Sequence, residues 1–166
     1  MKLWPGWLVV LAAACTTGST TARSTTTATE SNAIVIRVID GDTIDAKVNG
    51  VETRIRLIGI DTPETKKKNT PIQCYGPEAS AYTTSLLPAD TPIRIERDVV
   101  GRDDYGRLLG YIYRTADNLF VNLDIVRQGY ARVLTIAPND TLSSGFVEAA
   151  RAAEANNQGL WAACSG

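Results

Sequence analysis

The chain has 166 residues, about the size of one domain, and its 17 Lys and Arg against 18 Asp and Glu give a formal net charge of -1. Hydrophobic residues make up 44% of it, which is enough for a core and excludes a disordered tail, a coiled coil and a multi-span membrane protein. The absence of histidine removes Ser-His-Asp hydrolysis, Cys-His proteolysis and His-ligated zinc or iron sites. The near-neutral balance also argues against binding nucleic acid mainly by bulk positive charge.

Residues 1–15 have the layout of a secretory signal peptide. Lys2 is followed by an apolar run over 8–14 that is too short to span a bilayer. The run ends in Leu-Ala-Ala-Ala-Cys15, which resembles a bacterial lipoprotein signal in which the cysteine carries the lipid. We therefore expect an exported lipoprotein anchored to the bacterial cell membrane only through Cys15. Secretion after cleavage at an Ala-x-Ala site is the alternative.

Residues 16–32 follow as a segment rich in serine and threonine. Eleven of the sixteen residues over 16–31 are Ser or Thr, and none is a large apolar residue. Such a segment cannot bury enough surface to offset its ordering entropy. We predict a flexible tether between the membrane and a folded domain over 33–164.

Two cysteines remain for that domain, Cys74 and Cys164. An even pair in an exported domain suggests a disulfide, which here would join the middle of the chain to its end. Two free thiols or a two-cysteine metal site are the alternatives that the sequence leaves open.

Three strands are predicted in the first part of the domain. Residues 33–39 are β-branched and apolar, which is typical of a buried strand. Residues 43–48 alternate in polarity, and the Asn-Gly pair at 49–50 is the strongest short hairpin signal. The return strand over 51–60 continues the inward face with Val, Thr, Ile and Leu. Its outward face turns from polar to apolar at Arg56.

The rest of the chain predicts helices packed on further strands. A helix begins at Gly76-Pro77, where proline suits the first helical position, and Pro88 stops it. Strands follow around 93–95 and 109–113. Helices are expected near 121–128, ending at a glycine, and near 141–156. Short strands with many glycines and a few helices favour an α+β, mainly β, fold with a small closed barrel.

Three acidic clusters could carry chemistry. They are Asp-Gly-Asp-Thr over 40–43, Asp-Thr-Pro-Glu over 61–64 and Asp-Asp-Tyr-Gly-Arg over 103–107. In an extended chain the two carboxylates of the first cluster point to the same side. Each cluster alone also fits a structural role, as a hairpin turn, a helix cap and a surface loop respectively.

Together the three clusters predict a particular chemistry. Hard oxygen ligands without histidine favour Ca²⁺ or Mg²⁺ over zinc or copper. Two arginines beside such a cation suit a phosphodiester transition state, because guanidinium matches the charge on its equatorial oxygens. A nearby carboxylate could orient or deprotonate water.

Six motifs occur in the order and spacing of the staphylococcal (thermonuclease-type) nuclease family, which the chain resembles over about residues 33–162. They are Ile39-Asp-Gly-Asp-Thr43, Arg56-Leu57, Asp61-Thr-Pro-Glu64, Tyr75-Gly-Pro-Glu-Ala-Ser80, Tyr105-Gly-Arg107 and Val126-Arg-Gln-Gly129. The resemblance implies a five-stranded OB-fold barrel with three packed helices. It also implies a Ca²⁺-dependent endonuclease acting on DNA and RNA substrates. We expect a monomer.

Metal ligands follow from the resemblance by position. Asp42 and Asp61 resemble direct Ca²⁺ ligands, and the Thr62 carbonyl resembles a third. Asp40 resembles a nearby acidic residue that acts through water.

The resemblance also assigns residues to catalysis and substrate binding. Arg56 and Arg107 are similar to the phosphate-binding, charge-stabilising pair, and Glu64 to the general base or water-orienting group. Tyr105 resembles a phosphate or sugar contact. Lys66 and Lys67 either help bind substrate or belong to a solvated charge run.

Two departures from the family pattern bear on substrate binding. The best-known member has two tyrosines lining its base site where this chain reads Leu-Thr-Ile-Ala-Pro over 134–138, and a lysine where this chain has Asp104. Stacking contributes roughly 1–3 kcal/mol per base, so we expect weaker binding or a shifted base preference with the chemistry kept. The alternative function is an OB-fold nucleic-acid-binding lipoprotein with weak or no catalysis.

Overall fold

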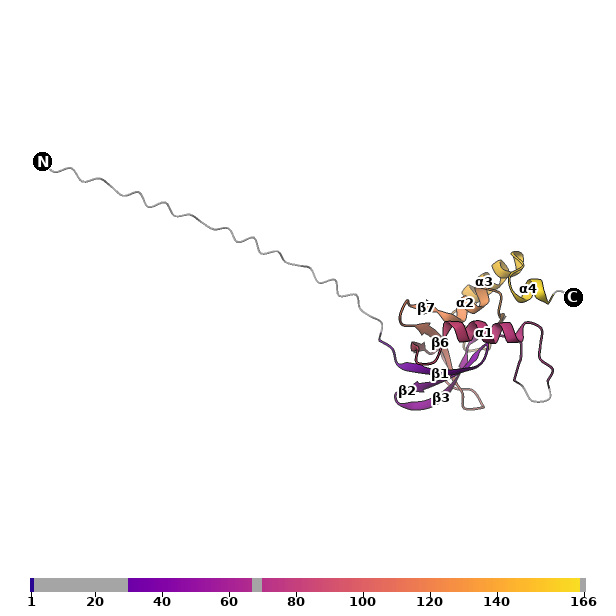
Figure 1. Cartoon of the computed structure of the whole chain (residues 1–166), viewed down its shortest axis with the longest axis horizontal. Helices are drawn as coiled ribbons and strands as arrows, with labels where there is room; N and C mark the ends of the chain where they lie inside the picture. Colours follow the sequence, from indigo (N-terminus) through magenta and orange to yellow (C-terminus); the bar gives the residue numbers. More distant parts are fainter. Residues whose placement is uncertain (2–29, 67–69, 165–166) are drawn as a thin grey trace.

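The computed structural model describes Met1, residues 30–66 and residues 70–164 (Figure 1). Cys15, nearly all of the predicted signal and most of the tether lie outside the described residues. Lys67 lies outside them too. The predictions made for these positions therefore stay predictions.

A closed barrel forms the centre of the domain. Its main sheet has the strand order β3-β2-β1-β5-β6-β7, and β3 also pairs with β6 in parallel, which closes the barrel. The predicted α+β fold with a five-stranded OB barrel is confirmed, and β7 and a small β4–β8 ladder add to it. The strands are β1 (Ala33–Asp40), β2 (Thr43–Val48), β3 (Val51–Leu57), β4 (Gly59–Asp61), β5 (Pro92–Glu96), β6 (Leu108–Arg114), β7 (Leu119–Phe120) and β8 (Arg132–Leu134).

The three predicted helices are present, with one short helix after them. In Figure 1, α1 lies across the barrel over β1, while the other three helices gather near the C-terminus. The helices are α1 (Gly76–Leu86), α2 (Val121–Arg127), α3 (Ser143–Ala155) and α4 (Leu160–Ala163). Among the described residues, no helix is both long and apolar enough to cross a membrane.

The β2–β3 hairpin turns where the sequence predicts it. Asn49 and Gly50 both have positive φ, 49° and 86°, as a tight hairpin turn with the right-handed twist requires. The register of this hairpin pairs Thr43 with Arg56. It therefore brings the arginine beside the first acidic cluster.

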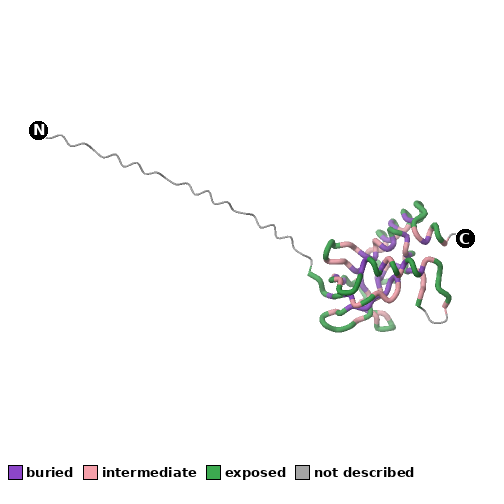
Figure 2. The backbone as a smooth tube through the Cα atoms, viewed as in Figure 1, coloured by how far each residue is buried: buried purple, intermediate pink, exposed green. Residues whose placement is uncertain are grey.

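The core fills the barrel and continues under α2 and α3 (Figure 2). Two expectations about the first strands are wrong in detail. β1 is not buried throughout, because its side chains alternate and Ile34 is 36% exposed. Val51 belongs to the inward face by alternation but is 65% exposed, because it lies at the hairpin end, beyond the core.

The predicted single strand over 51–60 is broken into β3 and β4. Gly59 has a φ of 84°, and a Cβ there would clash with the ring of Phe146. The buried Asn122 side chain bonds the backbone around the break, donating to the carbonyls of Ile58 and Gly110. The break turns the chain so that Asp61, at the end of β4, lies beside Arg56.

The predicted disulfide between Cys74 and Cys164 is confirmed. The two Cα atoms lie 5.9 Å apart, and the bond joins residues 90 positions apart in the sequence. It connects the segment before α1 to the end of α4, so the alternatives of free thiols and a two-cysteine metal site are excluded.

Candidate functional site

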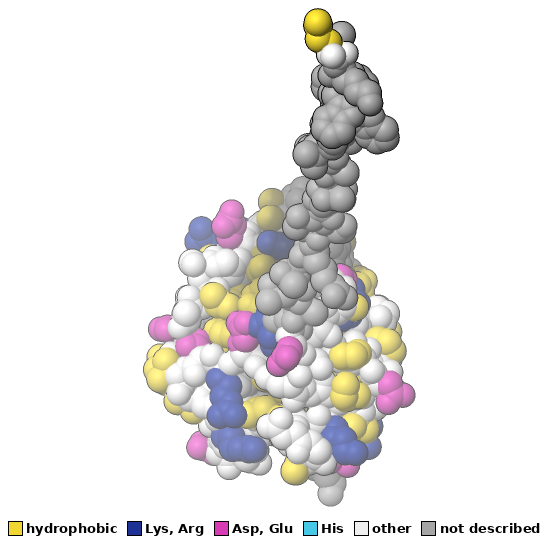
Figure 3. All heavy atoms as spheres, turned by 90° about the vertical axis from the view of Figure 1, so that its left-hand side faces the viewer, with side chains coloured by type: hydrophobic (Ala, Val, Ile, Leu, Met, Phe, Trp, Pro, Cys, Tyr) yellow, Lys and Arg dark blue, Asp and Glu magenta, His cyan; other side chains and the backbone are white. Residues whose placement is uncertain are grey.

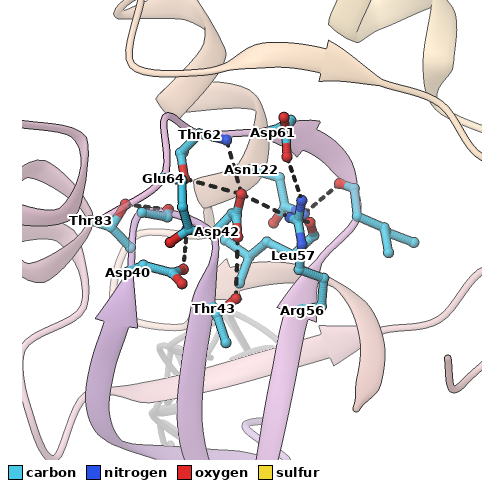
Figure 4. Close-up of polar contacts among 12 residues, drawn as sticks. Asp40, Asp42, Thr43, Arg56, Leu57, Asp61, Thr62, Glu64, Thr83 and Asn122 are labelled. Carbon is cyan, nitrogen blue, oxygen red and sulfur yellow. Dashed lines mark hydrogen bonds and ion pairs between the residues drawn. The ribbon is translucent and has the colours of Figure 1, made fainter. Parts of the chain in front are cut away.

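A polar cavity of about 340 Å³ lies where β1, β2, β3 and β4 meet (Figure 4). It brings together all four residues predicted to hold the metal and all three predicted to be catalytic. The lining residues are Asp40, Asp42, Thr43, Arg56, Asp61, Thr62, Pro63, Glu64, Thr70, Gln73 and Arg107.

Asp42 is the buried centre of this arrangement. Its Oδ2 accepts hydrogen bonds from the Thr62 backbone N–H at 2.9 Å and from the Thr62 hydroxyl at 3.0 Å. Its Oδ1 accepts one from the Thr43 hydroxyl at 3.2 Å. A Cβ on Gly41 would lie 2.6 Å from the Thr62 hydroxyl oxygen, so the two acidic clusters meet this closely because residue 41 is glycine.

The Arg56 guanidinium lies between two aspartates. Its two terminal nitrogens lie 3.1 Å from an Asp42 oxygen and 3.1 Å from an Asp61 oxygen. One of them also donates to the Leu57 carbonyl at 2.7 Å. The Arg56 side chain is only 13% exposed. Its positive charge therefore offsets the negative charge of the aspartates in an environment that contains little water.

Two carboxyl groups of the cavity have raised pKa values, mainly because they are partly buried. Burial, and then the charge of Asp42, raise the pKa of Asp40 to about 6. The pKa of Asp61 is also raised, by burial and then by Asp42, although Arg56 opposes the shift. Asp40 and Asp42 line the same cavity as predicted, but they are joined by a turn and not by an extended chain.

Glu64 lines the cavity from the segment between β4 and α1. Its Oε1 accepts a hydrogen bond from the Lys66 backbone N–H at 2.7 Å. The Lys66 side chain itself is exposed and does not line the cavity, so its predicted contact with substrate stays a prediction.

Arg107 reaches the same cavity from the loop before β6. Asp103 accepts hydrogen bonds from the Arg107 Nε at 2.7 Å and from its backbone N–H at 2.9 Å. Although burial acts to raise it, the pKa of Asp103 is lowered by these bonds. Tyr105 is 86% exposed, and the guanidinium carbon of Arg107 lies 5.5 Å from the centre of its ring.

Three residues support the site although none was predicted to be a catalytic, metal-binding or substrate-binding residue; of these, Asp103 belongs to the third acidic cluster. Asp103 anchors Arg107, and Gln73 bonds the Glu64 backbone. Thr83, buried in α1, donates to the Gly41 carbonyl at 2.7 Å and ties the helix to the first acidic turn. The only signal for Thr83 was a polar residue on the otherwise apolar face of α1.

A second, mostly apolar pocket of about 400 Å³ adjoins the first and shares Arg56 and Arg107 with it. Leu134, Ile136, Ala137 and Pro138 line it, together with Leu109, Tyr105 and Asp104. Most of the segment in which the sequence lacks the family's tyrosines therefore lies beside the two arginines.

Within the described ranges, no group of three or more His, Cys, Asp or Glu side chains is placed to hold a metal ion. The predicted ligand set differs from such a group, because its direct ligands are two carboxylates and one backbone carbonyl. It stays a prediction.

Comparison with known proteins places the chain in a family. The model of the family described as staphylococcal nuclease homologue matches residues 54–163. The chain belongs to this staphylococcal nuclease family. It is 41% identical to a thermonuclease of Staphylococcus intermedius over 128 residues, which are 77% of this chain and 74% of the relative.

Two further relatives of this chain support the family assignment. A thermonuclease of Staphylococcus hyicus is 39% identical over 127 residues, covering 76% of this chain and 73% of its own length. The endonuclease YncB of Bacillus subtilis (strain 168) is 36% identical over 132 residues, covering 78% of this chain and 61% of its own length. These similarities assign the chain to the nucleases that hydrolyse phosphodiester bonds.

Proposed function

We propose that this nuclease is an exported, Ca²⁺-dependent endonuclease that cuts DNA and RNA. The observation that carries the proposal is one cavity that holds two guanidinium groups, a cluster of carboxylates and Glu64. A phosphodiester transition state gains negative charge on its oxygens and needs a positioned water, and this set supplies groups for both needs.

The donor chemistry of the cavity fits Ca²⁺. Asp42, Asp61 and the Thr62 carbonyl would hold the ion, with Asp40 acting through water, and all of these donors are oxygens. Burial is the main cause of the raised pKa values of Asp40 and Asp61, and the charge of Asp42 adds to it; a bound cation would favour the ionised form of both groups. When bound, the ion would supply positive charge that stabilises the phosphate and lowers the pKa of nearby water.

The two arginines bind and stabilise the phosphate. Each presents a planar guanidinium that can donate two parallel hydrogen bonds to phosphate oxygens. The contacts that Arg56 makes with Asp42 and Asp61, and Arg107 with Asp103, orient both groups in advance. Such preorganisation lets them stabilise developing charge without reorganising.

Glu64 orients a water molecule or takes its proton. It lines the same cavity as both arginines, so a water beside it would also lie beside the bound phosphate. Removal of a positioned base of this kind costs about 10²–10⁴ in rate.

The apolar pocket next to the arginines would receive a base or sugar of the substrate. Leu134 and Ile136 offer aliphatic contact area where the best-known family member has two tyrosines, so we expect weaker binding than with bases stacked on those rings. Bulk charge does not compensate, because the formal net charge of the chain is -1. On the one face shown in Figure 3, Lys and Arg side chains are likewise interspersed with Asp and Glu.

The proposal that the protein is exported rests on the sequence of the first fifteen residues. The apolar run ending in Leu-Ala-Ala-Ala-Cys15 supports lipidation of the cysteine and anchoring to the bacterial cell membrane, with the Ser/Thr-rich segment as a tether. Secretion without a lipid is the alternative. Mass analysis of the protein released from a bacterial membrane fraction would distinguish the two by the presence of acyl chains on Cys15.

Single substitutions test the catalytic roles. Arg56→Ala and Arg107→Ala should each lower kcat on single-stranded DNA by about 10²–10³, as for other lost transition-state donors. Arg127→Ala, a matched change in α2 outside the cavity, should leave kcat within about twofold. If folded Arg56→Ala and Arg107→Ala proteins cut as fast as the parent protein, these roles are wrong.

A further inference from the structure

Gln73 holds the backbone of Glu64 from both sides. Its side-chain Oε1 accepts a hydrogen bond from the Glu64 N–H at 2.8 Å. Its own backbone N–H donates to the Glu64 carbonyl at 3.0 Å. Both polar backbone groups of Glu64 are therefore bonded to one residue, which itself lines the cavity.

The start of α1 completes this arrangement by close packing. A Cβ on Gly76 would lie 2.7 Å from the Thr65 methyl carbon and 3.1 Å from the Glu64 carbonyl oxygen. The Gly76 N–H also donates to the Gln73 carbonyl at 3.1 Å. The Glu64 segment, the Gln73 turn and the first turn of α1 therefore lie in direct contact.

The disulfide anchors this turn to the rest of the domain. Gln73 and its neighbours over 71–74 are exposed, so few buried contacts hold them. Cys74, next to Gln73, is bonded to Cys164 at the end of α4. That helix is itself fixed, because Leu160 is buried and its N–H donates to the Gly129 carbonyl at 2.8 Å.

We propose that Gln73 is a positioning residue for Glu64, and that the Cys74–Cys164 disulfide keeps Gln73 in place. This inference rests on the proposed function, in which Glu64 acts on the attacking water. A displacement of about 1 Å in a catalytic group can cost about 10² in rate. Opening the disulfide therefore slows the chemical step while the barrel stays folded.

Gln73→Ala in the full chain tests the first half of the proposal, with single-stranded DNA as the substrate. We expect kcat to fall about tenfold while KM changes less than about threefold. Ile72→Ala, an exposed neighbour outside the cavity, is the matched control and keeps the parent kcat.

A double-mutant cycle with Glu64→Ala separates positioning from a general structural effect. Because Gln73 acts through Glu64, adding Gln73→Ala to Glu64→Ala should lower kcat no further. An equal loss in both backgrounds would mean that Gln73 acts independently of Glu64, which overturns the inference.

Reduction of the Cys74–Cys164 disulfide tests the second half of the proposal, that this bond keeps Gln73 in place. With reductant, we expect the kcat of the parent protein to fall to the level of Gln73→Ala, with far-UV circular dichroism unchanged. The double variant Cys74→Ser/Cys164→Ser should have that lower kcat with or without reductant. Unchanged kcat after complete reduction overturns the role of the disulfide.

The inference and the proposed function fail in different ways. If Glu64→Ala lowers kcat by about 10² or more and folded Gln73→Ala does not lower it at all, only the inference is wrong. If Glu64→Ala itself keeps the parent kcat, the proposed role of Glu64 is wrong and the inference falls with it.

Discussion

Asn122→Ala removes three hydrogen bonds made by one fully buried side chain. The Asn122 Oδ1 accepts from the Ile112 N–H at 2.9 Å, and Nδ2 donates to the carbonyls of Ile58 at 2.9 Å and Gly110 at 3.2 Å. The Gly110 carbonyl also accepts from the Ile58 N–H, so it keeps one partner. The substitution therefore removes a partner from three backbone groups, leaves the Ile112 N–H and the Ile58 carbonyl unsatisfied, and creates a small cavity.

The size of the effect follows from these losses. Each unsatisfied buried group costs about 1–3 kcal/mol, so we expect the free energy of unfolding to fall by about 3–5 kcal/mol. Urea titration followed by circular dichroism measures this difference. Asn156→Ala is the matched control, because its Nδ2 bonds the Ala152 carbonyl at an exposed helix end, and it should cost less than about 0.5 kcal/mol.

One result of the comparison between Asn122→Ala and Asn156→Ala would refute this reasoning. If the two asparagine variants lose the same free energy of unfolding within about 1 kcal/mol, the buried bonds at the β3–β4 break do not stabilise the fold as argued. A fall in kcat of Asn122→Ala, measured where the variant is folded, would further indicate that the break positions Arg56 and Asp61.

Three other predictions follow from the geometry. Cys74→Ser/Cys164→Ser should lower the free energy of unfolding by about 2–4 kcal/mol in urea titrations, because the disulfide closes a long loop. Mass analysis of the parent protein should show a gain of two hydrogen atoms on reduction. The pKa of Asp40 is raised to about 6 by burial and Asp42, so its ionisation destabilises the fold as pH rises from about 4 to above 6. Asp40→Asn should therefore stabilise the protein by about 1–2 kcal/mol near pH 8, after allowance for solvent screening, and not near pH 4, in chelator. Asp104→Lys should lower KM for single-stranded DNA at low salt, with the gain lost as salt rises, since it replaces repulsion by a phosphate contact. A KM that is unchanged at every salt concentration would place Asp104 away from the substrate.

Local signals in the sequence predicted much of the fold. The Asn-Gly turn at 49–50 and the proline at the start of α1 act through their own backbone preferences, so short stretches were enough. The burial of β1 and of Val51 was misjudged, because it depends on where the core ends and not on the polarity of the strand itself.

The candidate site also contains residues that the sequence predicts and residues that it does not. The residues expected to bind metal and phosphate lie in motifs, and the structure brings them to one cavity. Two of the supporting residues, Asn122 and Thr83, were not predictable, because each acts through contacts between distant segments. Asn122 bonds the backbone 64 positions away, and Thr83 bonds a carbonyl 42 positions away. For Asn122 and Thr83, the only signal in the sequence was a polar residue in an otherwise apolar pattern.

Digestion of single-stranded DNA by the purified protein, with Ca²⁺, with Mg²⁺ and with chelator, tests the central claim most directly. We predict cutting with Ca²⁺ that chelator abolishes, and that Asp42→Ala also abolishes in a protein that circular dichroism shows to be folded. Cutting that persists in chelator would contradict the metal-dependent mechanism. No cutting by the folded protein with any metal would contradict the assignment of an active nuclease and favour a module that only binds nucleic acid.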